Sequence, residues 1–216
     1  MQQIGAQLPA GDGVGRFNHL YLSVTEDVAG VVGAEFEDPA FLAELDVAFA
    51  ALYFAAVDAA AGRRRVTHAW APLFAARRRH GIAPIQFALA GMNAHINRDL
   101  AVALAATAHR RGLTLADDTP QHRDYERVNK VLQAVEKRIK AEYATGLIGV
   151  SDHVLGRLDD VVAMWCVTAA RDAAWTHAKT LAALEGHHLL RTRFVDTLDQ
   201  MVGFAGRGLL VPLLDV

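Results

Sequence analysis

The sequence predicts an all-α protein in which about six or seven helices pack as a single-domain bundle around one central helix. Much of its 52% hydrophobic fraction is alanine, the strongest helix former, whereas only 7% of the residues are aromatic. Apolar residues recur at helical spacing along most of the chain, and alternating β-branched segments are scarce. We therefore expect one helical domain over residues 16–216, preceded by a flexible N-terminal arm over residues 1–15.

Capping residues, prolines and glycines set the expected helix boundaries in order along the chain. Phe17–Val32 carries apolar residues at helical spacing. Asp38-Pro39 is a capping residue followed by proline at the first helical position, and it starts a helix that ends at Gly62. The later helices are expected at Pro72–His80, Pro84–Arg111 (the central helix), Pro120–Tyr143, Asp152–Leu184 and His188–Ala205.

Composition and charge exclude several classes of protein. The 22 basic against 24 acidic residues give a net charge of −2, which offers no electrostatic reason to expect nucleic acid as a partner. The single cysteine, Cys166, excludes internal disulfides and cysteine-rich zinc modules. The start of the chain lacks a signal-peptide pattern, and its apolar stretches are shorter than the roughly 18 residues of a membrane span. We expect a cytoplasmic protein without a membrane partner.

The central helix carries two separate sets of polar side chains. Gln86, Asn93 and Asn97 fall on one narrow stripe, flanked by leucines. His95 and Asp99, four residues apart, fall on a different stripe roughly opposite. A buried amide without a partner costs about 1–3 kcal/mol, so the three amides should either bond neighbouring helices or face a polar pocket.

His95 and Asp99 admit three interpretations. As a helical His-x-x-x-Asp pair they could be two ligands of a divalent metal such as zinc. In a metal-free site Asp99 would orient the imidazole of His95, which would act as a general acid or base. The third interpretation is a structural histidine–carboxylate pair that packs in the core.

Two further helices bring polar groups to apolar faces. Asp46 and Tyr53 share a stripe on the helix that starts at Pro39, and a carboxylate there should be paired. Arg171 and Trp175 share a stripe near the end of the chain, where Trp175 could stack on the guanidinium. Arg171 would pair with a buried carboxylate, Asp46 or Asp99 being natural partners, or would bind an anionic substrate.

Several segments together resemble a family of uncharacterised actinomycete proteins that is carried as a domain of unknown function. These segments are FNHLYLSVT, LDVAFAALYFAA, AWAPLF, QFALAGMNAHINRDL, DYERVN, ARDAAW and AGRGLL, of which GMNAHINRDL is the most specific part. The resemblance covers nearly the whole chain and implies a helical domain, but it carries no activity and no catalytic residue. His-x-x-x-Asp on a central helix is also similar to part of the pattern of zinc-dependent phospholipase C and P1 nuclease.

The sequence thus leaves two classes of function open. The first is an enzyme that acts on a small, anionic molecule in an internal polar pocket, with or without a metal. Its candidate catalytic residues are His95, Asp99, Arg171 and Tyr53, and its candidate ligand-binding residues are Asp46, Gln86, Asn93, Asn97 and Trp175. The second is a non-catalytic ligand-binding or scaffold protein whose buried polar residues form a structural network. Either class is compatible with a homo-oligomer.

Overall fold

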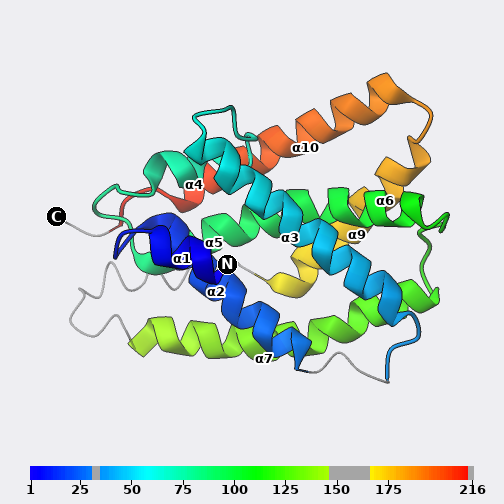
Figure 1. Cartoon of the computed structure of the whole chain (residues 1–216), viewed down its shortest axis with the longest axis horizontal. Coiled ribbons are helices and arrows are strands. Elements are labelled where there is room, and N and C mark those ends of the chain that lie inside the picture. Colours follow the sequence, from blue (N-terminus) through cyan, green and yellow to red (C-terminus); the bar gives the residue numbers. More distant parts are fainter. Residues whose placement is uncertain (31–34, 146–165, 214–216) are drawn as a thin grey trace.

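The computed structural model describes residues 1–30, 35–145 and 166–213 of the chain. Every regular element in these ranges is a helix, which confirms the predicted all-α class (Figure 1). The elements are α1 (Gln2–Gln7), α2 (Gly13–Ala29), α3 (Pro39–Ala61), α4 (Ala71–Ala76), α5 (Pro84–Ala94), the π-helix η1 (His95–Leu100), α6 (Ala101–Arg110), α7 (Pro120–Thr145), α9 (Val167–Ala183) and α10 (His188–Leu209).

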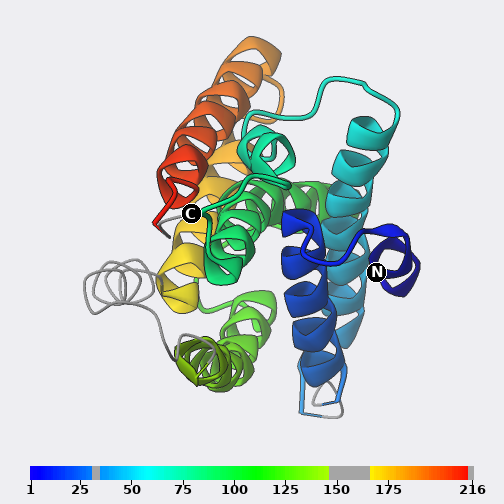
Figure 2. The same cartoon turned by 90° about the vertical axis from the view of Figure 1, so that its left-hand side faces the viewer.

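The segment α5–η1–α6 runs through the middle of the molecule, as predicted for the central helix. Figure 2 shows α2 and α3 on one side of it, α9 and α10 on the other, and α7 below. All residues from Ile85 to Ala94 are buried. One hydrophobic core cluster joins these layers and includes residues from Val14 to Leu210.

The central helix differs from the prediction in its backbone. The sequence predicts one uninterrupted α-helix, whereas the residues from His95 to Leu100 form a π-helix between two α-helical segments. A π-helical turn accommodates an extra residue, and such turns occur frequently at functional sites. Here the turn contains both His95 and Asp99.

The N-terminal segment also differs from the prediction. Residues 1–15, expected as a flexible arm, contain helix α1 and the first turn of α2. Asp12 is the N-cap of α2, because its carboxylate accepts a hydrogen bond from the Val14 N–H at 2.9 Å. The same carboxylate accepts a hydrogen bond from Arg77 Nε at 2.8 Å, which fixes the start of α2 against the end of α4. Part of the expected helix Asp152–Leu184 lies outside the described residues.

Helix α3 is apolar and only partly covered. Among the described helices it alone is long and apolar enough to cross a membrane by length and composition, and 28% of its most apolar window is buried. Val47 on this helix is 71% exposed. The inner face of α3 supplies Phe41, Leu45 and Tyr53 to the core.

Glycines allow the neighbouring helices to approach the centre closely. A Cβ added at Gly91 of α5 would lie 2.3 Å from the ring of Phe17 on α2. A Cβ added at Gly203 of α10 would lie 2.2 Å from the carbonyl oxygen of His68. Since His68 precedes α4 and presents backbone here, α10 can pack at this distance only because residue 203 has no side chain.

We predict that Gly203→Ala destabilises the protein by about 1–3 kcal/mol, because the methyl group meets a backbone atom that cannot rotate away. Gly208→Ala is the matched control on the same helix, since nothing lies within 4 Å of its added Cβ. Its better helix propensity should stabilise the protein by up to about 1 kcal/mol. Urea denaturation measures both variants, and equal effects would contradict the packing argument.

Candidate functional site

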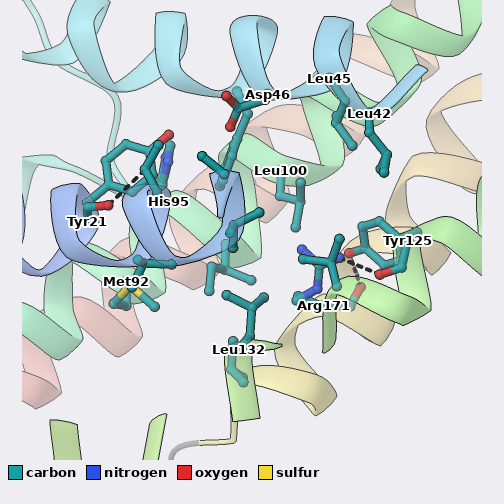
Figure 3. A pocket seen from close by; sticks show the side chains of 18 of the residues that line it. Tyr21, Leu42, Leu45, Asp46, Met92, His95, Leu100, Tyr125, Leu132 and Arg171 are labelled. Carbon is teal, nitrogen blue, oxygen red and sulfur yellow. Dashed lines mark hydrogen bonds between the residues drawn. The ribbon is translucent and has the colours of Figure 1, made fainter. Parts of the chain in front are cut away.

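A cavity of about 390 Å³ lies between α2, α3, the π-helix η1, α7 and α9. Its wall is mostly apolar, and valine, leucine, isoleucine, methionine and phenylalanine side chains supply most of it. The polar side chains on the wall gather toward two ends, as Figure 3 shows. Tyr21, Asp46 and His95 lie together at one end, and Tyr125 and Arg171 lie at the other.

His95 is buried in an aromatic cage. The residue is 1% exposed, and Phe49 stacks on its ring with a centroid distance of 3.6 Å and an interplanar angle of 7°. Tyr21 meets the ring edge-on at 4.5 Å. Burial lowers the pKa of His95, against the opposing effects of the Asp99 hydrogen bond and of the Asp99 and Asp46 charges. The imidazole is therefore neutral at neutral pH.

Asp99 fixes the orientation of that neutral ring from behind. The fully buried carboxylate accepts hydrogen bonds from Trp70 Nε1 at 2.8 Å and from Arg98 Nη1 at 2.7 Å. His95 Nδ1 lies 3.4 Å from its Oδ2. Since a carboxylate only accepts, Nδ1 carries the proton and Nε2 is left with a free lone pair.

Two polar atoms at this end of the cavity have no hydrogen-bond partner among the described residues. They are His95 Nε2 and the Tyr21 hydroxyl, both of which are buried. Burial, the Asp46 and Asp99 charges and Tyr53 together raise the pKa of Tyr21, so its hydroxyl is a donor at neutral pH. An unpartnered buried polar group costs about 1–3 kcal/mol. A polar group of a ligand at this end could therefore accept from the Tyr21 hydroxyl or donate to His95 Nε2.

Asp46 lies at the edge of the same end of the cavity. The residue as a whole is exposed, yet its carboxyl group is close enough to the apolar wall for desolvation to raise its pKa. A positive charge on His95 would act in the opposite direction. The sequence predicts a paired carboxylate on a buried stripe, whereas Asp46 is exposed and forms no ion pair with a described residue.

Arg171 differs from its predicted pairing. It is 7% exposed, but it forms no ion pair with Asp46, Asp99 or any other described carboxylate. Its Nε donates to Asn129 Oδ1 at 2.5 Å and its Nη2 donates to the Tyr125 carbonyl at 2.8 Å. Both acceptors are neutral and come from α7, so no carboxylate of the described residues pairs with this positive charge on the cavity wall.

The partner that stacks on Arg171 also differs from the prediction. The guanidinium lies 3.9 Å from the centroid of the Tyr125 ring, whereas Trp175 lies off the cavity. Trp175 instead donates to Asp117 Oδ1 at 3.2 Å and packs on His122. Burial raises the pKa of Tyr125 to about 12, and its hydroxyl donates to the Arg171 carbonyl.

The amide stripe of the central helix serves a different purpose. Gln86 Nε2 donates to the carbonyls of Leu209 and Val211, and Asn93 Nδ2 donates to the carbonyl of Val202. Asn97 in turn donates to Asn93 Oδ1 at 3.0 Å. These amides bind the C-terminal end of α10 and do not line the cavity. Their predicted position opposite His95 and Asp99 agrees with the structure.

Tyr53 is likewise placed outside the cavity wall. The residue is fully buried, and its hydroxyl donates to Asn18 Oδ1 at 3.0 Å. Of the nine candidates, the structure brings Asp46, His95 and Arg171 to the cavity, with Asp99 directly behind His95. Among the polar residues of the cavity wall, Tyr21, Thr25 and Tyr125 are those that the sequence did not single out. Tyr21 lay on the expected apolar stripe of its helix, and nothing in its spacing distinguishes it from a core aromatic.

The donor geometry does not fit a metal held by His95 and Asp99. The imidazole presents Nδ1 to Asp99, so the two side chains face each other and not a common third point. Both Asp99 oxygens already accept from Trp70 and Arg98. Among the described residues, no group of three or more His, Cys, Asp or Glu side chains could hold a metal ion.

A family model described as a family of unknown function (DUF5995) matches residues 1–212. This match confirms the resemblance to a domain of unknown function, while the actinomycete source stays a prediction. No curated protein and no solved structure matches the chain.

We predict that His95 makes the protein less stable in mild acid. Its folded pKa is lowered, so the unfolded chain binds the proton more readily and stability is lost as the pH falls below the ordinary value of about 6.5. Between about pH 7 and 5 the free energy of unfolding should fall by up to about 1.4 kcal/mol per pH unit more steeply in the wild type than in His95→Phe.

Tyr21→Phe is the matched control for this measurement, because it alters the same cage but keeps the imidazole. Its free energy of unfolding should retain the wild-type dependence on pH. Denaturant titrations over this pH range give the slopes, and identical slopes for the wild type and His95→Phe would contradict a buried neutral His95.

Proposed function

We propose that the chain, which belongs to the DUF5995 family of unknown function, binds a small molecule with an apolar body and an anionic group. The single observation that carries this proposal is the buried guanidinium of Arg171, which lines an apolar cavity without a carboxylate partner among the described residues. The anionic group would bind at Arg171, and the apolar body would fill the cavity between Arg171 and His95.

The charge of Arg171 supports the anionic part of this ligand. Buried charges are nearly always paired, and an isolated one costs several kcal/mol. Asn129 and the Tyr125 carbonyl satisfy two N–H groups but supply no negative charge. A carboxylate on the ligand would accept from the guanidinium and neutralise it, an interaction stronger than a hydrogen bond between neutral groups.

The size and wall of the cavity support the apolar part. Ligand sites for small molecules typically enclose about 300–1,000 Å³ and are mostly apolar, with a few placed polar groups. The cavity has about 390 Å³, and between its two polar ends Leu100, Leu132 and Met92 form the wall (Figure 3). Burial of apolar ligand surface there contributes about 25 cal/mol per Å² before the costs of binding.

The end formed by Tyr21 and His95 supports a second polar group on the ligand. The Tyr21 hydroxyl can donate and His95 Nε2 can accept, and neither has a partner in the part of the chain that the structure describes. A hydroxyl or carbonyl group on the far end of the ligand would satisfy one or both atoms. The ligand class is therefore a medium-length carboxylic acid, with a polar substituent remote from the carboxylate as the preferred form.

We predict that Arg171→Met weakens the binding of decanoate by about ten- to a hundredfold, since hydrogen bonds to charged groups contribute about 1.5–3 kcal/mol. Isothermal titration calorimetry measures the affinity, and decanol is the matched ligand because it keeps the chain length without the charge. The affinity for decanol should change little in the same variant. Equal losses for both ligands would contradict a role for the Arg171 charge.

Leu132→Trp tests whether the ligand occupies the cavity, independently of the Arg171 charge. It keeps the arginine and fills part of the cavity, so it should weaken both decanoate and decanol. Arg193→Met, on the exposed surface of α10, removes the same charge elsewhere and should leave both affinities unchanged. Circular dichroism checks that each variant stays helical.

A second candidate function is acid–base catalysis on the same ligand class, which the free lone pair of His95 Nε2 favours. In this version His95 takes a proton from a water molecule that attacks a carbonyl group of the substrate. Asp99 is a positioning residue that holds the imidazole through Nδ1, and Arg171 binds the anionic group. The leaving group accepts the proton back from Nε2. A metal-dependent version is not supported, because the Asp99 oxygens are already occupied.

We predict for this candidate that the 4-nitrophenyl monoester of sebacic acid is hydrolysed by the wild type and not by His95→Gln. Asp99→Asn should reduce kcat more than KM, because the ring loses its orientation while the binding groups remain. Release of 4-nitrophenolate measures the rate. An unchanged rate in His95→Gln would exclude His95 as the base, while binding of decanoate to that variant would keep the binding proposal.

A further inference from the structure

A second pocket lies on the surface beside the end of α3 and helix α4. Unlike the central cavity, it is open and is lined by many charged side chains. The sequence contains two arginine triplets, at residues 63–65 and 77–79. The fold brings them together, and five of these side chains line one open pocket of about 870 Å³. We call it the arginine pocket, and its arginines are Arg63, Arg64, Arg77, Arg78 and Arg79.

The arginine pocket has a strong local excess of positive charge. Among the described residues that line it, none is acidic. Arg77 pairs with Asp12 at 2.8 Å, whereas the other four arginines form no ion pair with a described carboxylate. These four are exposed, so their charges face the solvent in the pocket. Like charges this close repel each other, and a bound polyanion would remove that repulsion.

The backbone of Arg63 is an independent observation at the same place. Arg63 has φ +52°, a left-handed conformation that non-glycine residues rarely adopt. It follows the capping residue Gly62, where the Arg64 N–H donates to the Ala59 carbonyl and the Arg63 N–H donates to the Ala60 carbonyl. This is a Schellman motif, in which glycine is the usual residue at the position that Arg63 occupies. The sequence has an arginine at this position although the backbone conformation favours glycine, and its side chain lines the pocket.

We propose that the arginine pocket binds an anion that carries several phosphate groups. Guanidinium groups bind phosphate oxygens bidentately, and arginine is preferred over lysine where planar recognition of phosphate matters. Five arginines from the two triplets line one pocket, and they match several phosphates close together better than a single carboxylate. The net charge of −2 does not oppose this proposal, because the field at the pocket depends on the local arginines.

The test uses tripolyphosphate as the probe and isothermal titration calorimetry as the measurement. Tripolyphosphate should bind the wild type at one site, and its affinity should fall steeply between about 50 mM and 200 mM salt. The double variant Arg64→Gln/Arg78→Gln should weaken binding at least about tenfold. Arg193→Gln/Arg207→Gln is the matched control, because it removes two exposed arginines of α10 and changes the net charge equally. Equal losses in both double variants, or no saturable binding to the wild type, would overturn the proposal.

Arg63→Gly tests the strained residue separately. It should raise the melting temperature, since glycine adopts a left-handed φ freely, and it should weaken tripolyphosphate binding. A variant that binds tripolyphosphate like the wild type would overturn the assignment of Arg63 to the site.

The phosphates could belong to a soluble ion or to a lipid headgroup, and a vesicle assay distinguishes these sources. Phosphatidylcholine vesicles with and without phosphatidylinositol bisphosphate are sedimented with the protein. Binding that requires the bisphosphate, and that tripolyphosphate displaces, identifies the headgroup. Tripolyphosphate binding without vesicle binding identifies a soluble anion. Either result supports the pocket, and failure of both overturns it.

Discussion

The carboxylate of Asp99 is the buried charge around which the centre of the molecule is arranged. Three donors converge on it: Trp70 ahead of α4, Arg98 on the same π-helix, and His95. Arg98 also reaches toward Asp199 on α10, which accepts from the backbone N–H groups of the residues before Trp70. A buried carboxylate is tolerated only with such compensation. The network therefore holds the central helix, the start of α4 and α10 in one register.

The contact with Asp99 explains why Nε2, and not Nδ1, is the nitrogen of His95 that could accept a hydrogen bond from a ligand. Because Nδ1 is committed to Asp99, the free Nε2 belongs to the side of the ring that forms part of the cavity wall. Phe49 and Tyr21 exclude solvent from the ring, which keeps it neutral. The same helix uses its opposite stripe for purely structural bonds to α10. One helix thus has one face that bonds α10 and another face that lines the cavity. From the sequence, bonding to neighbouring helices and facing a pocket are alternatives, whereas the structure contains both.

Periodicity was sufficient to predict the helical class, the central helix and the opposition of its two polar stripes, because these depend on spacing within one helix. It could not identify the partners of Arg171, since Asn129 and Tyr125 come from α7 and only the packing of α7 against α9 brings them together. The π-helix could not be predicted from the sequence either, because the segment from His95 to Leu100 contains no helix-breaking residue. In the sequence, Tyr21 has the spacing of a core aromatic residue. Only the structure shows that its buried hydroxyl has no hydrogen-bond partner among the described residues and that its ring packs edge-on against His95.

Net charge is a poor guide to the surface of this protein, and the reason is structural. Elsewhere on the molecule, arginines are neutralised by nearby carboxylates, as where Arg123 and Arg127 bind Glu37 and where Arg111 binds Asp38. Net charge is a sum over the whole chain, so it carries no information about where unpaired charges lie on the surface. Both arginine triplets flank the segment that joins α3 to α4, and the arginines of the pocket other than Arg77 form no ion pair with a described carboxylate. The fold therefore concentrates positive charge in a pocket at the end of α3, and a net charge taken from composition alone averages that charge away.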